Sequence, residues 1–408
     1  MRYGEAALRV KILSFLSALI LLFCLIPGVA GAGSPFPEDS LSGVKEGWAW
    51  PVVVVPPPEG WDSPSGRSIK AAMRSAEREI SLRRDAIRGH EVTFMFSSIS
   101  RPSGLNERMA AWRSMGAGVI VSFGGGEMDE ALMRLCTSNG PPVDFAGGED
   151  LAIIDSAAGV VNPYLFALDL PYFARANALA EVAAAEEPQK KVAVMTDMMS
   201  EKLAKGAELN TKFLAARGIG AVDMSVSAYR QDQFNSQVRN AEAGGFEVFT
   251  CWLDAMAALS IWRTIHVKSS GSVVYYAGNQ HRILLDAEGL ILVDKDVLLI
   301  RNDVGRRNIA IKVRDMLNVD PEDTVAAAKA FALAKWVIAA HMETASNRIQ
   351  PLASALAATS GIPLMDEDIS INPATHRPVS RSFGVLRIEK RGFKSFGRVE
   401  VFSSEASE

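Results

Sequence analysis

Several residues suited to holding a small ligand follow directly after short apolar segments of the sequence. Ser122, Gly124, Gly125 and Gly126 come after the apolar run 119–121 and before a helical pattern. The free N–H groups and the positive dipole end of such a helix can hold a carboxylate, and glycine lets a ligand approach the backbone closely. An ordinary tight turn between a strand and a helix accounts for the same residues equally well.

A second set of candidate residues occupies similar positions later in the chain. An aromatic face can cover an apolar group or a cation, and a carboxylate can pair with an ammonium group. A helix cap explains the two aspartates of this set at least as well. The members of the set are Asp197, Trp252, Asp254, Tyr276 and Asn279. Trp61, in the loop after the first apolar run, either faces a ligand or occupies an interfacial core position.

The sequence lacks the motifs of the common enzyme classes. It has no G-x-S-x-G elbow, no phosphate-cradling G-x-x-x-x-G-K, and no G-x-G-x-x-G after a predicted strand. Its histidines are scattered and lack the paired spacing of a metal site. They are His90, His266, His281, His341 and His376. We therefore predict no catalytic residue, no metal and no cofactor.

The first 32 residues have the pattern of an export signal. Arg2, Arg9 and Lys11 precede the apolar run 12–26, and small residues surround Ala32. The run is shorter than the roughly 20 residues that a membrane-spanning helix needs. We expect cleavage after Ala32, a flexible lead over 33–47, and a mature protein in the periplasm or otherwise outside the inner membrane.

The elements that must position the candidate residues alternate along the chain. The β-branched run 51–55 predicts a strand buried on both faces, and apolar residues at helical spacing follow it over 69–80. The same alternation recurs between 192 and 277, and it implies parallel sheets with right-handed crossovers. Since the chain exceeds the roughly 250–300 residues of a single core, we predict an α/β protein of two doubly wound lobes. A long Ala-rich helix over 320–345 and a hairpin near 385–392 complete it.

Charge and cysteine content restrict the partners of this fold. The chain has 43 Lys and Arg against 47 Asp and Glu, so the total does not indicate a nucleic-acid binder. A basic stretch over 387–398 is best explained as a solvated hairpin face. Cys136 and Cys251 fall in different predicted lobes, which favours two buried thiols over a disulfide.

Three local motifs, in this order and spacing, resemble those of a known family. They are Phe166-Ala167-Leu168-Asp169, Asp232-Gln233-Phe234 after a strand, and the segment 372–378, Asn-Pro-Ala-Thr-His-Arg-Pro. From Trp50 to its C-terminus the chain resembles the type I periplasmic solute-binding proteins, which include the leucine/isoleucine/valine-binding protein of ABC importers.

This resemblance implies a division into lobes and a mechanism. It places 48–167 and 296–360 in an N-terminal lobe and 168–295 and 361–408 in a C-terminal lobe with its tail, joined by a three-strand hinge. A monomer would then trap a small ligand between its lobes, and an ABC permease would recognise the closed form. A sensory module for a receptor and an exported hydrolase with an atypical site remain the alternatives.

The resemblance also bears on the ligand, which we expect to be an amino acid or a related carboxylate. Gly148 and Asp150 stand where amino-acid binders of the family supply further carboxylate contacts, although an acid there would repel a carboxylate. Those binders place a tyrosine and an acidic residue in the second lobe. Here Trp252 and Asn279 stand near those places, and Asp254 is a substitute for the missing acid.

Overall fold

The computed structural model describes residues 49–83, 89–99, 101–136, 140–147, 154–155, 160–169, 172–226, 230–268, 271–278, 281–294, 303–364, 367–379 and 382–400. The predicted signal peptide 1–32 and lead 33–47 lie outside the described residues.

Five parallel strands form the first sheet, in the order β2-β1-β3-β4-β7. The strands are β1 (Ala49–Val55), β2 (Glu91–Phe96), β3 (Val119–Ser122), β4 (Val143–Phe145) and β7 (Leu165–Ala167). Side chains alternate across a strand, so the valines of β1 supply two different cores. Val52 and Val54 face one core and Val53 and Val55 the other, and all four are fully buried.

Helices cover both faces of this sheet. α2 (Pro64–Arg83), α10 (Asp303–Leu317), α11 (Thr324–Thr344) and α12 (Ile349–Ala358) share the core of Val52, and α3 (Leu105–Ser114) and α4 (Gly126–Leu135) share that of Val53. In the described part of the chain, only α11 is long and apolar enough to cross a membrane, and most of its apolar segment is buried inside this lobe. The late helices thus complete the lobe that the N-terminal strands begin.

The second sheet has seven strands, in the order β18-β17-β12-β11-β10-β8-β9. The first five along the chain are mutually parallel, whereas the last two form an antiparallel hairpin at the edge. The strands are β8 (Lys191–Asp197), β9 (Ala221–Val226), β10 (Phe246–Trp252), β11 (Val273–Tyr276), β12 (Ile291–Asp294), β17 (Ser382–Glu389) and β18 (Gly392–Glu400). Lys390 and Arg391 both have positive φ, as a tight two-residue hairpin turn requires, and the predicted hairpin is confirmed.

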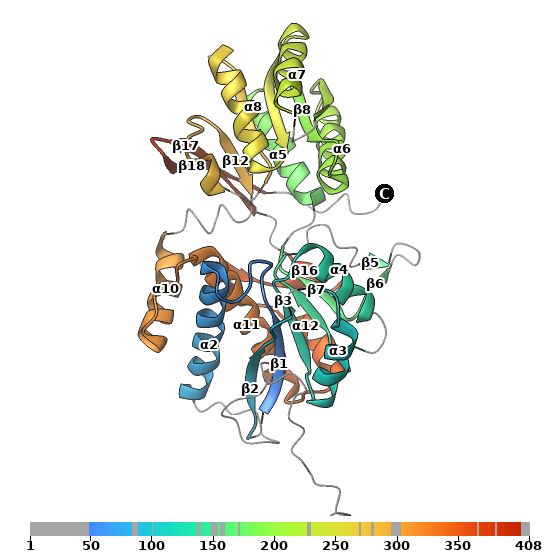
Figure 1. The fold of residues 1–408 in the computed structure, drawn as a ribbon, viewed down its shortest axis with the longest axis vertical. Coiled ribbons are helices and arrows are strands. Elements are labelled where there is room, and N and C mark those ends of the chain that lie inside the picture. Colours follow the sequence, from blue (N-terminus) through green and yellow to red (C-terminus); the bar gives the residue numbers. More distant parts are fainter. Residues whose placement is uncertain are drawn as a thin grey trace, which may run out of the picture.

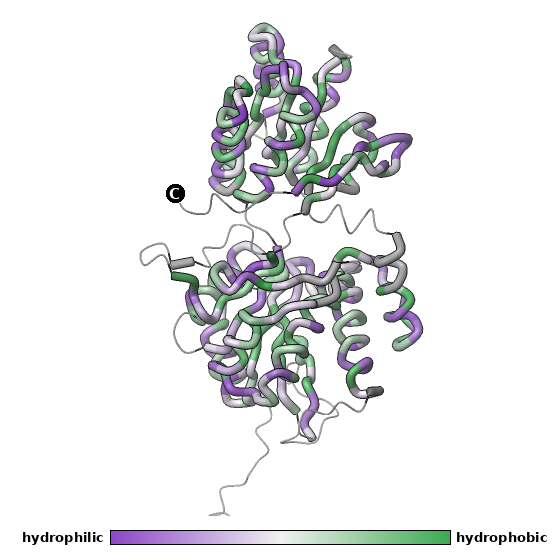
Figure 2. The backbone as a smooth tube through the Cα atoms, turned by 180° about the vertical axis from the view of Figure 1, so that it is seen from behind, coloured by the Kyte–Doolittle hydropathy of each residue, from purple (hydrophilic) through white to green (hydrophobic). Residues whose placement is uncertain are grey.

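Helices cover this sheet on both faces as well. α5 (Tyr172–Glu186) and α6 (Glu201–Ala216) pack on one face. α7 (Gln231–Ala243), α8 (Ala255–Lys268) and the 3-10 helix η2 (His281–Leu284) pack on the other. Figure 1 shows the two resulting lobes one above the other, and Figure 2 shows helices that alternate between apolar and polar segments, as half-buried helices must. The prediction of two doubly wound α/β lobes is confirmed.

Small two-stranded sheets lie at the margin of the first lobe. They pair β5 (Ile154–Asp155) with β6 (Val160–Val161), β13 (Ile362–Leu364) with β14 (Glu367–Ile369), and β15 (Ile371–Asn372) with β16 (Arg377–Pro378). Ile371 lies in the core of the first lobe. The His376 ring stacks on Phe166 of β7 at 4.3 Å between ring centroids. The division that the resemblance implies places this segment in the second lobe, whereas these contacts attach it to the first. We propose that the second lobe resumes only after Val379.

In the order of the described elements, the chain passes between the lobes three times: from β7 to α5, from β12 to α10, and from β16 to β17. Because β7 and β12 each leave their sheet at the carboxyl end, the carboxyl ends of both parallel sheets face the side of the crossings. Asp169, at the first crossing, accepts two 3.1 Å bonds from the Lys329 ammonium, and its carbonyl accepts a bond from Arg377. These contacts fix the crossing to the first lobe.

Candidate functional site

Each sheet reverses its strand order at one place. In the first sheet the chain moves from β1 outward to β2 and then returns to β3 on the other side of β1; in the second, β8, β9 and β10 repeat this pattern. Ligands of open α/β sheets bind outside the carboxyl ends of the strands at such switch points. The candidate site is therefore formed by the loops 56–63 and 123–125 of the first lobe and 198–200 and 253–254 of the second.

The loop after β3 depends on its glycines. Gly125 has φ 62° and Gly126 has φ 44°, and such positive φ values are strained for any residue that carries a side chain. A Cβ at either position would have no heavy atom within 4 Å, so the loop is open at both. At Gly124 a Cβ would lie 2.6 Å from Cγ of Met128. The structure thus places the predicted glycines together at the start of α4.

Ser122 is fully engaged within this loop. Its hydroxyl donates to Oδ1 of Asp129 at 2.5 Å and accepts from the Gly124 N–H at 3.2 Å. Asp129 is buried and lies in the first turn of α4 beside Glu127. The positive end of this helix therefore already faces a carboxylate of the protein. The Ser122 hydroxyl and the Gly124 N–H bond to each other. The predicted groups that remain for a ligand carboxylate are therefore the backbone N–H groups at the start of α4.

Trp61 lies in the loop after β1 and is half-buried. Its indole N–H donates to the Ser97 carbonyl at 2.5 Å, and its ring meets Phe96 edge to face at 5.2 Å. The side chain is thereby held over the end of β2, with part of its surface accessible.

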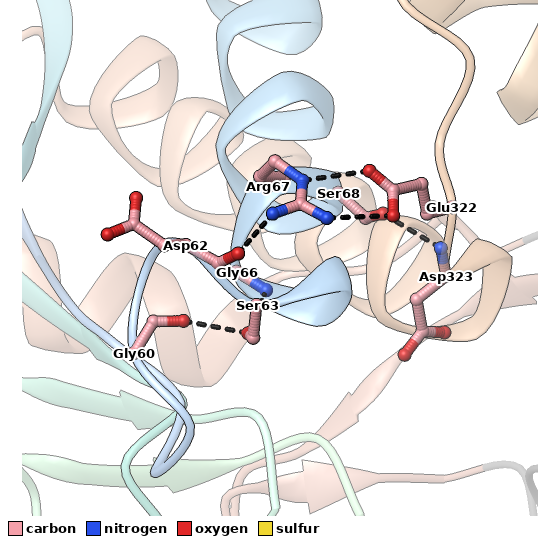
Figure 3. Close-up of polar contacts among 8 residues, drawn as sticks. All are labelled: Gly60, Asp62, Ser63, Gly66, Arg67, Ser68, Glu322 and Asp323. Carbon is pink, nitrogen blue, oxygen red and sulfur yellow. Dashed lines mark hydrogen bonds and ion pairs between the residues drawn. The ribbon is translucent and has the colours of Figure 1, made fainter.

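The loop that carries Trp61 is anchored to two helix starts. Ser63 donates to the Gly60 carbonyl at 2.7 Å and caps α2 by accepting from the Gly66 N–H at 3.0 Å. As Figure 3 shows, Arg67 forms a two-pronged ion pair with Glu322 at 2.8 Å. The N–H of Asp323, the N-cap of α11, donates to Ser68 at 2.8 Å. An ion pair and a hydrogen bond thus join the starts of α2 and α11 next to the loop.

In the second lobe both predicted aspartates accept hydrogen bonds from backbone N–H groups close to them in the sequence. Asp197 is buried and accepts from the Met199 N–H at 3.0 Å. Asp254 is exposed and accepts from the Ala257 N–H at 2.9 Å at the start of α8. The helix-cap explanation is therefore confirmed for Asp254. It is wrong for Asp197, because the N-cap of α6 is Ser200, whose hydroxyl accepts from the Leu203 N–H, and the bond of Asp197 closes the turn before that cap.

The two aromatic candidates of the second lobe need correction. Trp252 is 1% exposed and Tyr276 2% exposed, so neither offers a ring to a ligand. Trp252 points into the face covered by α6, where the absence of a side chain at Gly206 makes room for the indole. Tyr276 points to the opposite core. The other predicted site residues, Gly148, Asp150 and Asn279, lie outside the described residues.

Three exposed methionines that were not predicted from the sequence lie in the switch loops of the second lobe or directly next to them. Met198 and Met199 follow β8, Met256 lies in the first turn of α8, and their exposed fractions are 58%, 72% and 58%. Methionine is flexible and polarisable, and it suits contact with apolar groups of varied shape. The sequence feature that could have identified them is the apolar pair Met198-Met199 between the end of a strand and a helix cap, where polar residues are usual.

The described residues offer little to a catalytic mechanism. Burial raises the pKa of the Cys136 and Cys251 thiols to about 12, and both cysteines are free and buried, as predicted. Burial also lowers the pKa of His341 and His376, whose rings bond to backbone carbonyls. Within the described ranges, no three His, Cys, Asp or Glu residues are grouped so that they could hold a metal ion.

Comparison with known proteins identifies the fold. No protein-family model matches the sequence, and no curated protein matches it either. Solved structures do match: a branched-chain amino acid ABC transporter periplasmic ligand-binding protein from Burkholderia xenovorans has a TM-score of 0.70 at 14% identity, over 86% of this chain and 95% of that one.

Two further structures agree. A solute-binding protein of an ABC transporter from R. palustris, in complex with benzoate, has a TM-score of 0.64 at 15% identity, over 88% of this chain and 98% of that one. A leucine-binding protein from Thermotoga maritima has a TM-score of 0.65 at 13% identity, over 86% and 98%. Two parallel-sheet lobes, three crossings and this similarity over most of the chain show that the protein has the type I periplasmic solute-binding protein fold.

Proposed function

We propose that the protein is an exported solute-binding protein that traps a small ligand between its lobes and delivers it to an ABC permease. The observation that carries the proposal is that both switch points lie on the side of the three crossings. A ligand held there contacts both lobes. Because it then binds the closed form more tightly than the open form, it shifts the population toward closure.

The ligand we propose is an amino acid or a related small carboxylate. The similar structures support this class, since they are named for leucine, branched-chain amino acids and benzoate. In the first lobe, the ring of Trp61 is the apolar contact we propose, and the N–H groups at the start of α4 are one of two candidates for the contact with the carboxylate. In the second, the methionines of the switch loops would cover an apolar part, and the exposed carboxylates of Asp254 and Glu201 are available to an ammonium group.

Location and assembly belong to the same proposal. An export signal over 1–32 would deliver the mature chain to the compartment in which an importer collects its solutes. The protein would act there as a monomer, since one chain supplies both lobes of the site.

The proposal is tested by identifying what the purified protein carries. Denaturing the protein and weighing the released small molecules should reveal a carboxylate, and adding that compound back should raise the melting temperature. Small-angle scattering should show compaction upon its addition. Chemical turnover of the compound would instead indicate an enzyme, and a scattering curve unchanged by a bound ligand would contradict trapping by closure.

A further inference from the structure

We infer that Lys70 forms an anion subsite with Trp61 and Phe96 at the carboxyl edge of the first sheet, and that it binds the carboxylate of the ligand. This inference rests on the proposed function and deepens it. It assigns the carboxylate of the ligand to a side chain of α2, whereas the position of the switch points identifies only the loops around the site.

The position of Lys70 follows from the geometry of α2. The helix starts at Pro64, directly after the loop that follows β1, and Lys70 lies in its second turn. Side chains of a helix lean toward its N-terminus, so the stem of Lys70 runs back toward the carboxyl edge of the sheet. Its ammonium accordingly lies 4.9 Å from the centroid of the Trp61 ring and 5.9 Å from that of Phe96.

The ammonium of Lys70 lies next to two aromatic rings. Among the described residues it forms neither an ion pair nor a hydrogen bond to an acceptor, although its side chain is half-buried. Burial lowers the pKa of Lys70, opposed by the charge of Asp62, and Arg74 lowers it further. A partly desolvated ammonium without an acceptor is unfavourable, and a bound carboxylate would satisfy it.

The neighbouring cations differ from Lys70 in this respect. Arg67 is held by Glu322, as Figure 3 shows, and the Asp62 carboxylate points away from it. Arg74 lies 4.9 Å from the Phe96 centroid and pairs with Glu77 at 2.6 Å. The cations on either side of Lys70 along α2 are therefore neutralised by carboxylates of the protein, whereas the ammonium of Lys70 can form an ion pair with a ligand.

The other candidate for the ligand anion is weakened by its own chemistry. At the start of α4 the buried Asp129 carboxylate accepts a hydrogen bond from the Ser122 hydroxyl, and a second carboxylate close to it would be repelled. At Lys70 the nearest rings also supply a surface for the apolar part of a ligand. Charge and shape thus favour a ligand with one carboxylate next to an apolar or aromatic body.

The test compares Lys70→Met with the parent protein, using calorimetric binding of benzoate, 4-hydroxybenzoate and leucine and of the corresponding amides. The methionine keeps an apolar stem against Trp61, so the fold should be retained. Arg78→Met, an exposed cation two turns further along α2, is the matched control. We expect Lys70→Met to weaken binding of the carboxylates at least tenfold, with little change for the amides and none in the control.

A second measurement uses the parent protein alone. The rate at which an amine-specific acylating reagent modifies Lys70, read by peptide mass spectrometry, should fall severalfold when a carboxylate probe is bound. If the parent binds a probe and compacts while Lys70→Met binds equally well, the subsite is overturned and the proposed function stands. If none of the probes binds the parent or protects Lys70, the subsite and the carboxylate class both fail.

Discussion

Asp144 carries a carboxyl group in the interior of the first lobe. It lies in β4 between Val121 and Phe166 of the neighbouring strands and is fully buried. Neither of its oxygens has a hydrogen-bond partner among the described residues. Burial raises the pKa of Asp144 well above its ordinary value, so the folded protein holds this group neutral.

We predict that Asp144→Val increases the free energy of unfolding by about 1–3 kcal/mol near neutral pH, because it removes an unpaired buried polar group. The unfolded chain releases the Asp144 proton near pH 4, whereas the folded chain keeps it, so the parent loses stability as pH rises above about 4. The advantage of the variant should therefore grow between about pH 4 and pH 7. Urea unfolding at several pH values measures it, and an advantage that is constant with pH would contradict the argument.

Gly206 shows packing overriding helix propensity at a single residue. A Cβ at this position of α6 would lie 2.3 Å from Cζ3 of Trp252. In an open helix, glycine to alanine would stabilise by about 0.5–1 kcal/mol. We predict that Gly206→Ala destabilises the protein by about 1–3 kcal/mol, because the indole must move.

The control for Gly206 is a double-mutant cycle. Trp252→Phe removes the part of the ring that the new methyl group meets, so Gly206→Ala should cost much less in that background. Equal costs in both backgrounds would show that Trp252 is not the obstacle.

At the scale of the element, the turn before α4 needs a backbone conformation that favours glycine. Gly125 has φ 62° and ψ 170°, which non-glycine residues avoid, yet nothing would touch a Cβ there. We predict that Gly125→Ala lowers the free energy of unfolding by about 1–3 kcal/mol through backbone strain alone. Gly147→Ala is the matched control, since a Cβ there is equally free and the φ of Gly147 is not positive, and it should change stability by less than about 0.5 kcal/mol.

The elements also show what sequence reasoning can and cannot supply. The β-branched run of β1 and the hairpin of β17 and β18 were predicted because periodicity and turn residues are local signals. The packing of 371–378 on the first lobe was not, since it depends on the contact of His376 with Phe166 far away in sequence. For the same reason, alternation places Trp252 on one face of its strand without revealing that α6 covers that face.

The candidate site also has features that the sequence predicts and features that only the packed structure reveals. Parallel strands put their following loops at one edge, so the sequence alone places Trp61, Ser122 and Asp197 at the carboxyl edge of a sheet. It does not reveal that Asp129 occupies Ser122, because that contact depends on the direction of the first turn of α4. Nor does it reveal Lys70, whose reach back to Trp61 appears only once α2 and the loop are packed together.

At the scale of the whole molecule, each lobe has its own cores, and the order of the described elements has the chain cross between the lobes three times. We predict that, without ligand, the lobes unfold as separate units. Gly125→Ala should then lower the midpoint of the first lobe only, and Gly206→Ala that of the second only. Hydrogen exchange followed lobe by lobe along a urea series measures the two midpoints.

A ligand held by both lobes must change this behaviour. Because it binds only when both lobes are folded and closed, its binding free energy stabilises them jointly, and the two transitions should move together toward one. Each glycine variant should then lower the common midpoint, whichever lobe carries it. A ligand that stabilises the first lobe and leaves the midpoint of the second unchanged would bind one lobe only, and trapping between lobes would be excluded for that ligand.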